Sequence, residues 1–283
     1  MSLSLFLQPF QNCKTRKIKS LKKTYFSFTY YIKFVNFDNL NVITMQIKKH
    51  IPNIITLLNL FCGCIALVFV AEKDFEMAFF FVCFGIFLDF FDGFFARLFK
   101  VSGPLGLQLD SLADMVTSGV VPGFVMFWML KQVQDPSSFN TILPYLGFII
   151  TLGSCYRLAN FNIDTRQTDS FIGLPTPANT LFIISLPLVI KYSNSLVVFD
   201  ILTNQWFLLA ITLFSAYILN AEIPLFSLKI KDFTFKKNAL QIVFLILCVL
   251  LLVFFQYLGI PLVIITYILL SVINNKFLKK KIV

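Results

Sequence analysis

Eight long apolar runs occupy most of the chain after residue 50, and they restrict it to one kind of fold. The runs are 54–71, 75–96, 107–130, 142–160, 178–191, 205–221, 239–257 and 260–274. A helix needs about 20 predominantly apolar residues to cross a lipid bilayer, and most runs approach that length. Because 58% of the 283 residues are hydrophobic and only 13% are charged, a soluble globular protein is excluded. We predict an all-α integral membrane protein, a polytopic bundle of about eight transmembrane helices.

The basic residues indicate how these helices are oriented. If the N-terminus is cytoplasmic, only Lys73, Lys131 and Lys191 of the 24 lysines and arginines fall on the outer side. Such an excess of basic residues on the inner side is typical of membrane proteins. It also accounts for the net charge of +10 without a nucleic-acid partner. We expect both termini in the cytoplasm, and the absence of a recognisable targeting peptide favours a bacterial cell membrane.

The first 44 residues differ from the rest of the chain. They are basic and aromatic without clean periodicity, whereas Met45 begins a short basic stretch that leads into the first apolar run. We therefore predict that 1–44 are an N-terminal extension, disordered or dispensable, and that 45–283 form one integral membrane domain.

Four aspartates interrupt the second and third runs. Asp89 and Asp92 are three residues apart, and Asp110 and Asp114 are four apart, so each pair lies on one face of a helix. An aspartate at the centre of a span costs about 2.5–3.5 kcal/mol. Two antiparallel helices, joined by a turn at Ser102–Pro104, would bring the pairs face to face. Because clustered carboxylates repel one another unless cations lie between them, we predict a site for Mg²⁺ or Mn²⁺, which prefer oxygen ligands.

Small residues accompany the acidic pairs. Gly93 and Ala96 share the helix face of Asp89, which leaves room for a ligand to approach the backbone. Any one of these residues has a common structural explanation, such as helix packing, but the whole pattern D-x2-D-G-x2-A-R-x8-G-x3-D-x3-D does not. The chain resembles the CDP-alcohol phosphatidyltransferase family at Asp89, Asp92, Gly93, Ala96, Arg97, Gly106, Asp110 and Asp114.

The resemblance implies a membrane enzyme that moves a phosphatidyl group from a CDP-linked lipid to an alcohol and releases CMP. It implies that Asp89, Asp92 and Asp110 hold a divalent metal, and that Asp114 both approaches the metal and accepts a proton. The residue types agree with this chemistry, because a metal polarises phosphoryl oxygens while a carboxylate takes the proton of the attacking hydroxyl. Family members are often dimers, so a homodimer is also implied.

The resemblance also implies which residues border the CDP-lipid. Gly93 and Arg97 match family positions that line the CDP site, and Arg97 can offer a fork of donors to a phosphate. Asn53 and Thr56 belong to a polar stripe that enters the first run and resembles the family's first helix. The expected CDP-lipid contacts are Asn53, Thr56, Gly93, Ala96, Arg97 and Ser102.

The stretch YRLANFNIDTRQTDSFIGLPTPAN, residues 156–179, resembles the segment that marks the serine-using members of the family. This resemblance implies CDP-diacylglycerol and L-serine as substrates and phosphatidylserine as product. We expect Arg157 to bind the serine carboxylate and Asn162 to contribute to the acceptor site. Asn160 stands where members often carry a second basic residue, which leaves one acceptor contact open. The predicted active site lies within about 51–180.

Three alternatives remain open from the residues. The same chemistry on glycerol 3-phosphate or an inositol derivative would favour more cations on the acceptor side than Arg157 and Arg166 supply. An intramembrane prenyltransferase would carry its aspartate clusters on helices well separated in sequence. A divalent-cation transporter should show matching polar positions in the second half of the chain, whereas the last three runs are almost purely Leu, Ile, Val and Phe.

Overall fold

A computed structural model of the chain describes residues 50–101, 103–134, 142–164, 171–226 and 239–280. The chain divides into two units, Met1–Ile51 and Pro52–Val283, and the following description concerns the second. The predicted extension 1–44 lies outside the described residues.

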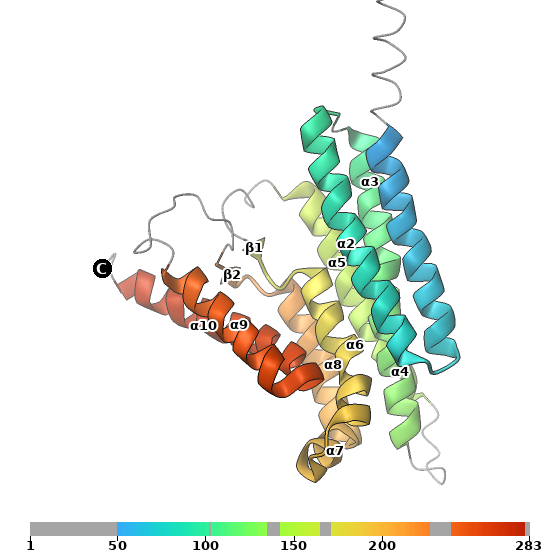
Figure 1. Cartoon of the computed structure of the whole chain (residues 1–283), viewed down its shortest axis with the longest axis vertical. Helices are drawn as coiled ribbons and strands as arrows, with labels where there is room; N and C mark the ends of the chain where they lie inside the picture. Colours follow the sequence, from blue (N-terminus) through green and yellow to red (C-terminus); the bar gives the residue numbers. More distant parts are fainter. Residues whose placement is uncertain (1–49, 102, 135–141, 165–170, 227–238, 281–283) are drawn as a thin grey trace, which may run out of the picture. The chain divides into compact units, whose positions relative to one another are not determined.

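Nearly every described residue belongs to a helix (Figure 1). The first described helix is His50–Ala71. It is followed by α2 (Phe75–Phe99), α3 (Pro104–Asp114), η2 (Met115–Val120), α4 (Val121–Val133), η3 (Leu143–Phe148), α5 (Ile149–Ile163), α6 (Thr176–Tyr192), α7 (Leu196–Leu202), α8 (Gln205–Asn220), α9 (Ala239–Phe255), η4 (Gln256–Leu258) and α10 (Gly259–Lys280). Two short strands, β1 (Phe171–Ile172) and β2 (Pro224–Leu225), pair antiparallel.

The predicted all-α membrane bundle is confirmed, because every predicted run falls on a helix or on consecutive helical segments. Within the described residues, four helices are long and apolar enough to cross a membrane, or five if α7 and α8, bent by 68°, count as one span. This number is smaller than eight partly because α6 has only 17 residues, short of the roughly 20 that a span needs. The fourth, Leu240–Asn275, comprises α9, η4 and α10, so two of the predicted runs are counted there as one. Helix α7 was not predicted.

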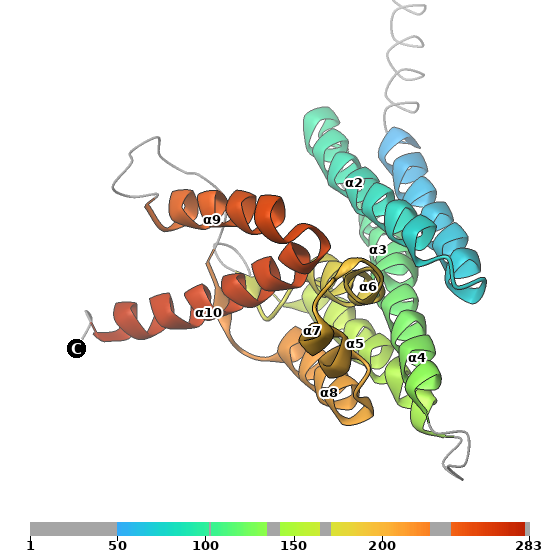
Figure 2. The same cartoon turned by 60° about the horizontal axis from the view of Figure 1, so that its bottom comes forward.

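The last two helices form a hairpin that packs beside the others (Figures 1 and 2). Helix α10 contacts α6 and β2. A separate apolar core under this hairpin joins Leu174, Leu225, Phe244 and Tyr267. The Tyr267 hydroxyl donates to the carbonyl of Phe226 at 3.0 Å.

One turn of π-helix, η2, follows Asp114 directly and fixes where that side chain lies. Pro122 has no backbone N–H, so it removes the helical partner of the Ser118 carbonyl. The Thr180 hydroxyl of α6 lies 2.8 Å from this carbonyl oxygen and can donate to it. Thr151 of α5 donates to the carbonyl of Gly119 at 3.0 Å. The π-turn is therefore anchored to α5 and α6, just beyond the acidic pair of α3.

Candidate active site

The structure brings the four aspartates of α2 and α3 together. One carboxylate oxygen from each of Asp89, Asp92 and Asp110 lies within 4.8 Å of the others. Asp114 lies close enough to Asp89 and Asp110 for their charges to interact. The geometric expectation that the pairs face each other is therefore correct.

The chain between α2 and α3 explains this arrangement. Helix α2 ends at Phe99. The next residue, Lys100, adopts the left-handed conformation with φ 55° and ψ 43°, and its N–H donates to the carbonyls of Ala96 and Arg97. Gly103 is extended, and Pro104 begins α3 with the backbone angle that a first helical turn requires. The chain thus reverses within a few residues and places the second acidic pair opposite the first. The C-terminal end of α2 and the N-terminal end of α3 lie together at the top of Figure 1.

The first helix contributes one donor to each pair. The Thr56 hydroxyl donates to Oδ2 of Asp92 at 2.5 Å, and Thr56 is only 3% exposed. The Asn59 amide nitrogen donates to Oδ1 of Asp114 at 3.3 Å, and Asn59 is fully buried. Both partners are neutral, so they orient the carboxylates without cancelling their charge.

A pocket of about 190 Å³ opens beside the acidic cluster. Its lining includes four of the residues expected to contact the CDP-lipid, together with two of the aspartates: Asn53, Thr56, Gly93, Ala96, Asp92 and Asp110. A Cβ added at Gly93 would meet only a guanidinium nitrogen of Arg97, 4.0 Å away, so the α2 backbone is open to the pocket there. Arg97 itself is exposed and does not line the pocket. Ser102 lies outside the described residues.

The acidic cluster fits a divalent cation. Its donors are all oxygens, which suits Mg²⁺ or Mn²⁺. The Asp89 Oδ1 atom is buried and has no hydrogen-bond partner, which is costly for a protein unless a ligand occupies the position. Among the residues that the structure describes, no lysine or arginine forms an ion pair with these carboxylates.

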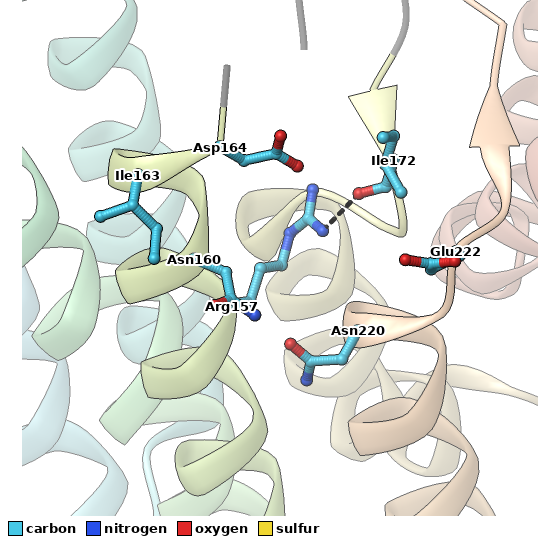
Figure 3. Close-up of a pocket in the computed structure, with 7 residues that line it drawn as sticks. All are labelled: Arg157, Asn160, Ile163, Asp164, Ile172, Asn220 and Glu222. Atoms are coloured by element: carbon cyan, nitrogen blue, oxygen red, sulfur yellow. Dashed lines mark hydrogen bonds between the residues drawn. The ribbon is translucent and has the colours of Figure 1, made fainter. Parts of the chain in front are cut away.

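A second pocket, of about 330 Å³, surrounds Arg157 and shares no lining residue with the first (Figure 3). Arg157 is 8% exposed, and its Nη1 atom donates to the carbonyls of Ile172 and Leu219, each at 2.7 Å. Figure 3 shows the guanidinium reaching from α5 toward β1, with Asn160 and Asn220 beside the same pocket.

Asn162, the other expected acceptor residue, faces α3. Its amide nitrogen donates to the Ser111 hydroxyl at 2.8 Å, next to Asp110 in the chain. Because Arg157 and Asn162 are five residues apart on a helix, their side chains point in different directions. The structure therefore does not bring the two expected acceptor residues together.

The model of the CDP-alcohol phosphatidyltransferase family matches residues 49–218, more than half of the chain. The chain belongs to this family. The match includes the acidic cluster and both pockets, except for Asn220 and Glu222 at the edge of the second.

Several curated relatives of this phosphatidyltransferase family carry the name CDP-diacylglycerol–serine O-phosphatidyltransferase. The protein of Bacillus subtilis (strain 168) is 35% identical over 133 residues, which are 46% of this chain and 70% of the relative. The protein of Helicobacter pylori (strain J99) is 32% identical over 135 residues, 47% of this chain and 55% of the relative. That of Saccharomyces cerevisiae is 30% identical over 164 residues, 52% of this chain and 57% of the relative. The chain thus spans little more than half the length of the last two.

Two glycines were missed as parts of the site of this family member. A Cβ on Gly85 would lie 2.8 Å from the side-chain oxygen of Asn59, and one on Gly63 would lie 2.4 Å from the hydroxyl oxygen of Thr117. Both distances are far inside van der Waals contact, so only glycine lets the first helix approach α2 and η2 this closely. Gly85 lies four residues before Asp89, on the same helix face, and this spacing was the available signal.

Proposed function

We propose that the protein transfers the phosphatidyl group of CDP-diacylglycerol to L-serine, forming phosphatidylserine and CMP. The convergence of the four carboxylates beside an open pocket is the observation that supports this most. The choice of serine is supported by the names of the relatives and by the resemblance of 156–179 to serine-using members. The active site would face the cytoplasm at the cell membrane.

In this proposal Asp89, Asp92 and Asp110 hold Mg²⁺ or Mn²⁺, with Asp114 beside them. A divalent cation held by these residues would offset the charge of the pyrophosphate and polarise its phosphoryl oxygens. Asp114 takes the proton of the serine hydroxyl, whose oxygen forms the new bond to phosphorus as the bond to the CMP oxygen breaks. Asn59 keeps one oxygen of Asp114 engaged from below.

The CDP portion would occupy the pocket beside the cluster. Asn53, Gly93 and Ala96 line it, and the absence of a side chain at Gly93 lets a phosphate approach the α2 backbone. Arg97, close to Gly93 and exposed, would offer its guanidinium to a phosphate oxygen. Ser102 remains part of the proposed set.

The serine would enter from the side of α5. Asn162 lies against Ser111, close in the chain to Asp110, and would contact the bound acceptor. Because the structure does not bring Arg157 and Asn162 together, the two residues would contact the acceptor separately. Arg157 donates from one guanidinium nitrogen to two carbonyls, and its remaining N–H groups would bind the serine carboxylate. A homodimer belongs to the proposal on the strength of the family resemblance alone.

A panel of labelled alcohols tests the substrate. Membranes carrying the protein would receive CDP-diacylglycerol, Mn²⁺ or Mg²⁺, and labelled serine, glycerol 3-phosphate or inositol in separate reactions. We expect a new labelled lipid and CMP from serine only, and neither after chelation of the metal. If lipid is made from glycerol 3-phosphate or inositol and not from serine, that alcohol is the substrate and the choice of serine is wrong. No lipid from any alcohol, with the protein folded, would contradict the proposed activity. The transporter alternative has no support in the comparisons.

A further inference from the structure

Beneath the acidic cluster, the first helix meets α2 and η2 at a tight junction. The carbonyl of Asn59 accepts a hydrogen bond from the Thr117 hydroxyl of η2 at 3.2 Å. Gly63 and Gly85 remove the two side chains that would otherwise hold these elements apart. Asn59 and Thr117 are fully buried, so solvent does not reach their polar atoms.

The amide of Asn59 has a defined orientation in this junction. A carboxylate only accepts hydrogen bonds, so the amide nitrogen of Asn59 must face Asp114 and the amide oxygen must face away. That oxygen is buried without a hydrogen-bond partner, opposite Gly85. A residue kept only for packing would be an apolar side chain of similar size, which leaves no buried acceptor unsatisfied. The free-energy cost of burying this oxygen without a partner indicates that the hydrogen bond of the nitrogen to Asp114 has a function.

We infer that Asn59 is a positioning residue that fixes the rotation of the Asp114 carboxylate, and that Gly85 provides the space this contact requires. This inference rests on the proposed function, in which Asp114 accepts the proton of the acceptor hydroxyl. By holding Oδ1, Asn59 restricts the directions in which Oδ2 can point. Proton transfer depends on such alignment, because the base must lie within hydrogen-bonding distance of the proton that it removes.

Thr56 performs the corresponding task for the other acidic pair. It lies one helical turn before Asn59 and donates to Asp92, one of the clustered metal-binding candidates. The two contacts of the first helix are therefore directed at different functions. Loss of the Thr56 contact should change the metal requirement, whereas loss of the Asn59 contact should change the rate of transfer.

The test compares steady-state kinetics of purified Asn59→Ala, Asn59→Leu and Thr56→Val proteins with those of the unaltered protein. CMP release is measured with whichever alcohol the unaltered protein accepts. For both Asn59 variants we expect kcat to fall about ten- to hundredfold, with the KM for CDP-diacylglycerol and the Mn²⁺ concentration for half-maximal rate unchanged. For Thr56→Val we expect the Mn²⁺ requirement to rise. Cys64→Ala, at an exposed position of the same helix, is the matched control and should behave as the unaltered protein.

Binding of CDP in the presence of Mn²⁺, followed by calorimetry, shows that a variant is folded. An unchanged kcat in Asn59→Leu would overturn the inference. So would a parallel loss of CDP binding and turnover in both Asn59 variants, because that result indicates a structural role. Gly85→Ala, which directs a methyl group at the Asn59 amide, should reproduce the fall in kcat, and full activity would also contradict the inference. If the unaltered protein releases no CMP with any alcohol, the proposed function fails instead.

Discussion

The acidic cluster and the pocket around Arg157 treat buried charge in opposite ways. The four carboxylates are met by each other and by two neutral donors, Thr56 and Asn59. The Arg157 guanidinium donates hydrogen bonds to two backbone carbonyls of the same chain. Charge that a protein leaves without a counter-charge calls for an external ligand. A charged group that is hydrogen-bonded to the backbone stabilises the local structure, whether or not it also binds a ligand.

The surroundings of Arg157 support this distinction. The two carbonyls lie on β1 and at the end of α8, so the guanidinium joins α5 to both. Gly173, the residue after Ile172, has φ +76°, and a Cβ there would lie 2.7 Å from Nη1 of Arg157. Its N–H donates to the carbonyl of Ile223 at 2.9 Å. Arg157 is thus one of the contacts that hold β1 against the chain that follows α8.

The largest effect should come from Asp114→Asn. Replacing the proposed base with a neutral amide of the same size should lower the rate of transfer by about 10²–10⁴-fold. Metal-dependent binding of CDP should persist, because the other three aspartates remain. Single-turnover release of CMP and calorimetry with CDP and Mn²⁺ measure the two quantities. Normal transfer by this variant would remove Asp114 from the role of base.

A second large effect is expected for Asp89→Asn, which replaces one of the three carboxylates that are close enough to share a cation. The amide supplies a weaker ligand than a carboxylate, so the Mn²⁺ concentration for half-maximal activity should rise about tenfold or more. Titration of activity with Mn²⁺ measures this change. Asp200→Asn, an exposed aspartate on α7, is the control and should leave the titration unchanged. An unaltered metal requirement in Asp89→Asn would mean that the cluster does not hold the cation.

The contrast between the two regions also explains what sequence could reveal. The clustering of the aspartates could be predicted because it follows from their fixed spacing on two adjacent helices. The partners of Arg157 are main-chain carbonyls, one of them 62 residues away, and no residue type announces them. The spacing of Gly85 and Asn59 in the sequence is only a weak indication of their role. Their role becomes clear only where the first helix, α2 and η2 approach one another closely. The π-turn after Asp114 depends on Pro122 together with hydroxyls from α5 and α6, and such contacts between distant segments are invisible to local pattern.

A third prediction decides between the two roles of Arg157. In Arg157→Gln, the carbonyls of Ile172 and Leu219 lose a charged donor, which should cost about 1–3 kcal/mol of stability. We expect a lower midpoint of thermal unfolding in detergent, with Arg157→Lys intermediate because one cationic donor remains. The measurement is paired with the KM for serine. A normal unfolding midpoint with a raised KM for serine would show that Arg157 contacts the acceptor and does not stabilise the fold. The proposed difference between the two regions would then be wrong.

The smallest effect should come from charge that is both matched and exposed to solvent. Lys191 of α6 forms an ion pair with Glu76 of α2 at 2.5 Å, and the side chains are 60% and 41% exposed. Because water already solvates such groups well, their mutual attraction adds little to stability. Lys191→Gln and Glu76→Gln should therefore leave both CMP release and the unfolding midpoint within the scatter between preparations. If either variant lowered the unfolding midpoint as much as Arg157→Gln does, burial of the guanidinium would not explain the effect of Arg157 on stability. The difference between the buried and the exposed charges would then need another cause.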